Sequence, residues 1–178
     1  YTTTQMREFV EEMRHKKFYS QMDFQTLFGF AIPQLARPPM VSGLKKSDRQ
    51  QQLARRIFGR HRLEDLRPTT ILQATDGLAG ESVVLTEGAV ADVVYAASAL
   101  SPFYPTHEVN GRWLADGAYM RPVPILEAVK RHADVIIALY YEEEPNPEPQ
   151  DLLEANYNIL AAYFRRLTKE QTMLAIDL

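Results

Sequence analysis

The sequence predicts an α/β domain built in layers, because segments typical of strands alternate along it with segments typical of helices. Runs of β-branched residues mark the strands, and apolar residues at helical spacing mark the helices. The 178 residues, of which 46% are hydrophobic and 24% charged, suit one globular domain, residues 1–178, with a sizeable core.

The first third of the chain contains two predicted helices separated by an irregular segment. Thr2 and Gln5 have the spacing of a capping box at the start of an amphipathic helix. Residues 24–43 are apolar but interrupted by two glycines and three prolines, so we expect an irregular or short-stranded segment instead of a long helix. Residues 47–66 return to helical spacing, and Gly59 is expected to end the first part of that helix.

The central part of the chain predicts strands, a helix and a hairpin. Residues 69–76 and 81–88 are rich in β-branched residues and are separated by Gly-Leu-Ala-Gly, which predicts a strand, a turn and a second strand. Residues 89–100 predict a helix of small residues that ends before the next proline. Within residues 107–116, the pair Asn110-Gly111 is typical of a tight hairpin turn.

The last third predicts two helices and two strands. Residues 122–132 begin with prolines that a first helical turn tolerates, and they lead into the apolar run 133–141, which we expect to be a buried strand. Residues 142–151 are acidic and rich in proline, as in a surface loop. A helix is expected over residues 152–167 and a final strand over residues 173–178.

Composition excludes several classes of function. A net charge of −3 gives no bulk attraction to nucleic acid, so no nucleic-acid partner is expected. The chain has no cysteine, and its four histidines are far apart in the sequence, so neither thiolate chemistry nor a metal site is expected. No phosphate-binding glycine motif follows a predicted strand, which argues against a nucleotide site. No apolar run approaches the roughly 18 residues that span a bilayer.

The pair Asp116-Gly117 follows an apolar strand and has two readings. Ligands of α/β sheets bind beyond the carboxyl ends of the strands, and a positive φ at Gly117 would turn the Asp116 carboxylate inward. Alternatively, Asp-Gly is only a turn, because both residues favour turns for local reasons. The dipeptide by itself leaves both readings open.

The surroundings of this pair carry a family resemblance. Residues 74–88, "ATDGLAGESVVLTEG", followed by residues 96–139, "AASALSPFYPTHEVNGRWLADGAYMRPVPILEAVKRHADVIIAL", resemble the patatin-like phospholipase family of lipid acyl hydrolases. A strand ending in Thr-Asp, a small-residue helix ending in Ala-Ser and an Asp-Gly-Ala motif occur in the order and at the separations of that family. The resemblance covers most of residues 42–139 and, less closely, residues 1–41.

This resemblance implies a fold and a mechanism. The fold is a patatin-like layered domain with a central, mostly parallel sheet flanked by helices. The mechanism uses a Ser-Asp dyad, in which Asp116 would be the general base and Gly117 and Ala118 would complete its motif. The implied substrate is a phospholipid or another acyl-ester lipid, cleaved through an acyl-serine intermediate. No cofactor is implied.

The sequence departs from the family at the nucleophile. The family places its serine in G-x-S-x-G after a glycine-rich oxyanion loop, and residues 1–178 contain neither. The simplest account is a chain that lacks an N-terminal segment with the first strand, the oxyanion glycines and the serine. The 178 residues alone are then not expected to hydrolyse esters. The alternative is a non-catalytic lipid-binding or protein-interaction domain of the same fold.

Other polar residues have local explanations at the sequence level. Ser98 lies at a predicted helix end without flanking glycines, which favours capping or packing. Asp76 precedes Gly77, which favours a turn over catalysis. His107 is expected to be an ordinary strand residue, because the family does without histidine.

Two segments suggest a peripheral contact with a membrane surface. A basic cluster suits either a solvated helix face or anionic lipid headgroups. Its members are Lys45, Lys46, Arg49, Arg55, Arg56, Arg60 and Arg62. The aromatic-rich residues 18–33 could form an acyl-binding wall, an interfacial cap or ordinary core.

Overall fold

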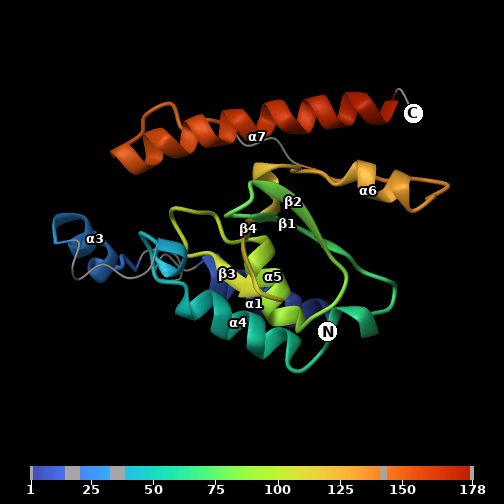
Figure 1. Ribbon diagram of the computed structural model, residues 1–178, viewed down its shortest axis with the longest axis horizontal. Helices are drawn as coiled ribbons and strands as arrows, with labels where there is room; N and C mark the ends of the chain where they lie inside the picture. The colour runs from blue at the N-terminus through green and yellow to red at the C-terminus, as the bar shows by residue number, and fades with distance from the viewer. Residues whose placement is uncertain (1, 15–20, 33–38, 141–143, 177–178) are drawn as a thin grey trace. The chain divides into compact units, whose positions relative to one another are not determined.

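The computed structural model describes residues 2–14, 21–32, 39–140 and 144–176. The chain divides into two compact units, Tyr1–Asp116 and Gly117–Leu178 (Figure 1). The first unit contains the sheet and four of the helices. The second contains three helical elements and no strand among its described residues.

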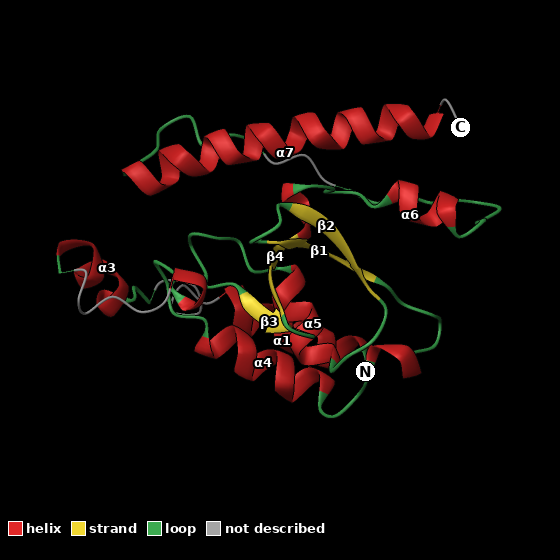
Figure 2. Ribbon diagram, viewed as in Figure 1, coloured by secondary structure: helices red, strands yellow, loops and turns green. Residues whose placement is uncertain are grey.

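The sheet of the first unit has four strands in the order β2-β1-β4-β3 (Figure 2). Their bounds are β1 (Leu72–Asp76), β2 (Glu81–Leu85), β3 (His107–Val109) and β4 (Arg112–Asp116). The strands that the sequence predicts here are therefore confirmed.

The direction of the strands differs from the expected, mostly parallel sheet. All three strand pairs of the described sheet are antiparallel. Two of the connections are too short for any other arrangement, because β1 and β2 are separated by residues 77–80 and β3 and β4 by Asn110-Gly111 alone. Parallel neighbours need a crossover of a dozen or more residues. The α/β class is confirmed, whereas a mostly parallel sheet is wrong for the described residues.

The hairpin between β3 and β4 has the predicted turn. Asn110 and Gly111 both have positive φ, 52° and 76°, and Val109 pairs with Arg112 across them. Two successive residues with positive φ give a turn whose twist matches that of the flanking strands, and Asn-Gly is the pair that adopts it most readily.

Three helices of the first unit agree with the sequence. They are α1 (Thr3–Arg14), α4 (Asp48–Phe58) and α5 (Val90–Ala97). The predicted capping box of α1 is present: the backbone N–H of Thr2 donates to Gln5 Oε1 (2.8 Å), and that of Gln5 donates to Thr2 Oγ1 (3.3 Å). Helix α4 ends at Gly59, whose φ is +56°. Short 3-10 helices, η2 (Pro39–Val41) and η3 (Leu63–Asp65), complete this unit.

Helix α3 (Phe24–Ala31) occupies the first part of the segment 24–43 that was expected to be irregular or short-stranded. Residues 33–38 of that segment lie outside the described part of the chain, and residues 39–43 form a short 3-10 helix and a loop. The carboxylate of Asp23 caps it by accepting from the backbone N–H groups of Gln25 (3.1 Å) and Thr26 (3.4 Å). Such a cap is worth about 1 kcal/mol, which offsets a cost of similar size for one glycine inside the helix. The expectation was wrong because it weighed Gly29 and the later prolines and overlooked the cap.

The core of the first unit lies between α5 and the sheet. Helix α5 contacts β1, β3 and β4. Val93, Ala96 and Leu114 are fully buried there, and they belong to one cluster with Leu63 and Val90. Helix α5 and strand β4 are therefore held by the same apolar contacts.

Gly43 marks a close approach of two backbone segments in this unit. A Cβ atom at Gly43 would lie 2.5 Å from the backbone nitrogen of Pro105 and 2.8 Å from the carbonyl carbon of Tyr104. We expect Gly43→Ala to reduce the free energy of unfolding by about 1–3 kcal/mol, since backbone must move. Gly77→Ala is the matched control: its Cβ would meet the flexible end of Met40 at 3.0 Å, so a smaller loss is expected in urea unfolding. Equal losses would contradict this account.

The second unit begins with η4 (Gly117–Tyr119) and continues with α6 (Ile125–Lys130) and α7 (Leu152–Ile176). Both α-helices were predicted, and they contact each other. The loop predicted from residue 142 is confirmed over 144–151, and its first two residues lie outside the described part of the chain.

Two strands expected in the second unit are not formed over its described residues, and residues 141, 177 and 178 of these segments lie outside the described part of the chain. Residues 133–140 have no ladder partner among the described residues, and Val135, Ile137 and Leu139 are 78%, 82% and 90% exposed. An apolar run becomes a buried strand only when neighbouring strands satisfy its backbone groups. Residues 173–176 continue helix α7 instead of forming a strand, because Met, Leu and Ala are good helix formers and extend an existing helix without a new nucleus.

Glu127 of helix α6 is buried among three cations. Its carboxylate lies 2.8 Å from Lys130 Nζ, 3.5 Å from an Arg131 nitrogen and 3.8 Å from an Arg121 nitrogen. The hydrogen bond from Lys130 and the charges of Lys130, Arg121 and Arg131 lower the pKa of Glu127 against the opposing effect of burial. The carboxylate is therefore stabilised in its charged form.

This lowered pKa predicts acid sensitivity of the second unit. A depressed folded-state pKa contributes stability above the unfolded pKa of about 4.3, and that contribution is lost as the pH falls through the lower folded value. We expect Glu127→Gln to lose about 0.5–1 kcal/mol at pH 7 and to become less sensitive to pH below 4.3. Urea unfolding followed by circular dichroism at pH 7 and pH 3 measures both effects. Glu148→Gln, in the exposed loop, is the control, and an equal effect there would contradict the assignment.

Candidate functional site

Asp116 is the last residue of β4, and its backbone is held by two neighbouring segments. Its N–H donates to the carbonyl oxygen of Ala99 (3.0 Å), and its own carbonyl oxygen accepts from the Thr75 hydroxyl (2.8 Å). Asp116 also pairs with Ala74 across the sheet. The side chain of Asp116 is half-buried. The backbone of Asp116 is therefore held by two segments of the first unit.

These bonds bring together the three motifs that carry the family resemblance. Thr75 comes from the Thr-Asp pair that ends β1, and Ala99 follows the Ala-Ser pair that ends α5. Both bond the backbone of Asp116 in the Asp-Gly-Ala motif. This role of Thr75 was not predicted from the sequence, although its place beside Asp76 in the Thr-Asp pair could have indicated it.

Gly117 begins the 3-10 helix η4 in the second unit. Its carbonyl oxygen accepts from the N–H groups of Met120 (3.2 Å) and Arg121 (2.9 Å), and the residue is buried. Gly117 is not among the glycines with positive φ, so the expected left-handed turn is wrong. A right-handed 3-10 turn needs negative φ, and it ends the strand without that conformation. Ala118 is the second residue of this turn.

Asp76 has the turn role that the sequence favoured. Its Oδ1 accepts from the backbone N–H groups of Leu78 (2.9 Å) and Ala79 (3.0 Å) at the start of the β1–β2 turn. These two hydrogen bonds, first that from Ala79, lower the pKa of Asp76. Gly80 completes the turn with φ +69°.

Ser98 and His107 also have the local roles that the sequence predicted. The Ser98 hydroxyl donates to the carbonyl oxygen of Val94 (2.8 Å) at the end of α5, which is a capping arrangement. His107 is the first residue of β3, and its Nε2 lies 3.3 Å from Oδ1 of Asp92. Its ring meets the Tyr95 ring edge-on at 5.2 Å. The carboxylate beside His107 thus belongs to Asp92 of helix α5.

The basic cluster lies mostly on exposed side chains of the first unit. Arg56 pairs with Glu12 and stacks at 5.7 Å over the Phe9 ring, and Arg62 pairs with Glu64. These contacts suit the solvated-face reading. Attraction of the cluster to lipid headgroups stays a prediction.

The aromatic segment forms the exposed helix α3. Phe24 and Phe28, one helical turn apart, are 65% and 61% exposed, so ordinary core is wrong for these two side chains. An acyl-binding wall or an interfacial cap stays a prediction. Residues 18–20 and 33 of this segment lie outside the described part of the chain.

The described residues offer neither a metal site nor a membrane-spanning helix. No group of three or more His, Asp or Glu side chains in the described ranges is arranged to hold a metal ion. Among the described helices, none combines the length and the apolar character needed to cross a bilayer.

Comparison with known proteins identifies the family. The family model described as patatin-like phospholipase matches residues 2–129, which is more than half of the chain. The chain belongs to the patatin-like phospholipase family. The resemblance seen in the motifs is therefore confirmed, and the patatin-like match includes Asp116, Gly117 and Ala118 while ending before α7. Patatin-like proteins are generally hydrolases that act on lipids.

Curated relatives of this patatin-like chain are known from mycobacteria. An uncharacterized NTE family protein of Mycobacterium bovis is 29% identical over 134 residues, and proteins described in the same words from two strains of Mycobacterium tuberculosis match equally. The alignment covers 75% of this chain but 36% of each relative. The chain thus spans about a third of the length of the relatives that it matches.

Proposed function

We propose that this chain is part of a lipid acyl hydrolase, of phospholipase A type or acting on another carboxylic ester, in which Asp116 is the general base of a Ser-Asp dyad. The observation that carries the proposal is the patatin-like match across Asp116-Gly117-Ala118, at the end of a strand. Gly117 and Ala118 complete the motif. No cofactor takes part in the proposed reaction.

The proposed reaction has two half-steps. The serine oxygen attacks the ester carbonyl carbon while the Asp116 carboxylate takes the hydroxyl proton. The tetrahedral intermediate collapses to an acyl-serine, and the lipid alcohol leaves with that proton. Water then attacks the acyl-serine and loses a proton to Asp116. The second tetrahedral intermediate collapses, the serine oxygen leaves with that proton from Asp116, and the fatty acid is released. A carboxylate with a pKa near 3.9 is a weak base towards a hydroxyl, so the step depends on close geometry and on stabilisation of the oxyanion.

The geometry of the first unit supports such a role. Hydrogen bonds with Ala99 and Thr75 hold the backbone of Asp116 at a strand end. A general base needs such a fixed position relative to its nucleophile. Asp76 accepts from two N–H groups of its own turn, which gives it a local structural role. We assign catalysis to Asp116 because it opens the Asp-Gly-Ala motif within the patatin-like match.

None of the serines in these 178 residues lies in the family's nucleophile motif. No G-x-S-x-G occurs in the sequence, so the proposal requires a serine from outside it. The same observation favours the alternative, a non-catalytic lipid-binding or protein-interaction domain that keeps the patatin-like fold. Exposed Phe24 and Phe28 would suit contact with a lipid surface in either case.

One labelling experiment separates the two functions. The longest form of the protein in its source is treated with a fluorophosphonate probe for activated serines and then mapped by mass spectrometry. The hydrolase predicts an adduct on a serine N-terminal to Tyr1 that is lost in Asp116→Asn but retained in Asp76→Asn. Full coverage without an adduct would overturn the hydrolase and leave the binding domain.

A further inference from the structure

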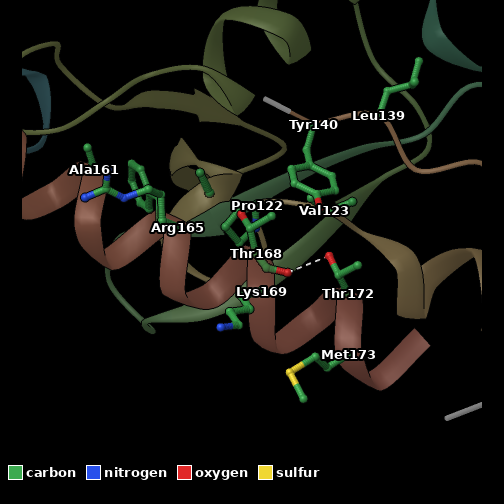
Figure 3. A pocket seen from close by; sticks show the side chains of 12 residues that line it. Pro122, Val123, Leu139, Tyr140, Ala161, Arg165, Thr168, Lys169, Thr172 and Met173 are labelled. Carbon is green, nitrogen blue, oxygen red and sulfur yellow. Dashed lines mark hydrogen bonds between the residues drawn. The ribbon is translucent and has the colours of Figure 1, made fainter. Parts of the chain in front are cut away.

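The second unit contains a cavity of about 530 Å³ along helix α7 (Figure 3). Ala118, the last residue of the Asp-Gly-Ala motif, is one of the residues that line it. The volume is in the range of about 300–1,000 Å³ that is usual for small-molecule sites. Helix α7 lies outside residues 2–129, so the family match does not assign this cavity.

Side-chain bonds hold α7 against the segment that follows the motif. The Gln171 amide accepts from the Val123 N–H (3.3 Å) and donates to the Met120 carbonyl oxygen (3.2 Å). The Tyr163 hydroxyl donates to the carbonyl oxygen of Tyr119 (3.1 Å). These contacts join the two sides of the cavity within the second unit.

Much of the cavity wall is apolar and open to solvent. Val123 and Ala161 are buried, whereas Leu139 and Met173 are 90% and 57% exposed. Large apolar side chains that gather at a cavity without being covered are typical of a surface that binds an apolar ligand.

Among the residues that the structure describes, the charged side chains that line the cavity are Arg165 and Lys169, which are one helical turn apart. No described Asp or Glu lines it. The nearby Glu170 lies 2.8 Å from Arg166, which is not a lining residue. In Figure 3 the nitrogen atoms of Arg165 and Lys169 lie on the left of the view and Leu139 on the right. A ligand that matches both the cationic side chains and the apolar wall of the cavity has an anionic head and an apolar chain.

We propose that this cavity binds a long-chain fatty acid anion. The carboxylate meets Arg165 and Lys169, and the chain packs along Val123, Phe164 and Met173. That this ligand is the product of the reaction rests on the proposed function, since ester cleavage releases a fatty acid beside the motif that contains Ala118. Binding itself needs no catalysis.

The test is direct binding of oleate to the 178-residue chain, measured by titration calorimetry below the concentration at which oleate forms micelles. Oleyl alcohol has the same chain without the charge, and inorganic phosphate is an anion without the chain. The variants are Arg165→Gln, Lys169→Gln and the double variant, with Arg166→Gln as the matched control because it lies on the same helix outside the cavity. Circular dichroism verifies that each variant is folded.

We expect one oleate per chain, a loss of about tenfold in affinity for each single variant and a larger loss for the double variant. Arg166→Gln should change the affinity less than twofold, and oleyl alcohol should bind more weakly and equally to all variants. Absence of saturable oleate binding would overturn the proposal. So would phosphate binding as tight as that of oleate, or a second copy of the chain that occupies the cavity in sedimentation experiments. Because no serine is needed, failure here leaves the labelling result unaffected.

Discussion

Asp116→Asn is expected to lower kcat by about 10²–10⁴-fold in a form of the protein that carries the nucleophile, with little change in KM. Asparagine has nearly the shape of aspartate, but its amide cannot take the proton of the attacking serine. The backbone bonds to Ala99 and Thr75 are made by main-chain atoms of residue 116, so they are available to the variant as well. We therefore expect the substitution to slow the chemical step and to leave the fold intact.

Steady-state hydrolysis of a soluble ester and of a phospholipid vesicle measures this effect. Asp76→Asn is the control, because it is the same substitution before a glycine at the end of the neighbouring strand β1. It should lower stability through the β1–β2 turn and leave kcat within about twofold. Activity retained in Asp116→Asn, or an equal loss in Asp76→Asn, would show that Asp116 is a turn residue.

Leu114→Ala is expected to reduce the free energy of unfolding of the first unit by about 2–5 kcal/mol. Leu114 is fully buried in the cluster that α5 forms with the sheet, so truncation removes apolar contacts and leaves a cavity. Leu114 and Asp116 stand two residues apart on β4 and thus share a face of the strand. The substitution should therefore also lower the activity assigned to Asp116.

Urea unfolding followed by tryptophan fluorescence measures this loss, because Trp113 is the one tryptophan of the chain and lies on β4 itself. Leu78→Ala is the matched control: Leu78 is 71% exposed in the β1–β2 turn, and a change within about 0.5 kcal/mol is expected. If Leu114→Ala behaved like this control, the core would not lie where the structure places it.

Interactions between residues close in the sequence could be predicted well. The capping box of Thr2 and Gln5, the end of α4 at Gly59 and the hairpin at Asn110-Gly111 all form as their local patterns indicate. Each involves a few neighbouring residues, so its energy hardly depends on the rest of the fold. Two local patterns were misread. At α3 the Asp23 cap was overlooked, and at Gly117 a 3-10 turn forms without the expected positive φ.

Features that depend on partners distant in the sequence could not be predicted. The run 133–140 has the composition of a buried strand, yet it is exposed because no described strand pairs with it. The cavity beside Arg165 and Lys169 was missed as well, although two cations one turn apart on a helix face that also carries Ala161, Phe164 and Met173 could have indicated it. Whether such residues face a cavity depends on what α7 packs against.

By itself the sequence determined the α/β class, the positions of most helices and strands and the patatin-like family, since short motifs and their order carry that information. The role of Asp116 as general base stays a prediction from the same motifs. Only the tertiary structure decided that the described sheet is antiparallel and that Thr75 and Ala99 hold the backbone of Asp116. The physical reason is the separation along the chain of the residues that interact. Propensity, capping and turn formation act within a few residues, whereas strand pairing and the closure of a site depend on segments that meet only in the folded chain.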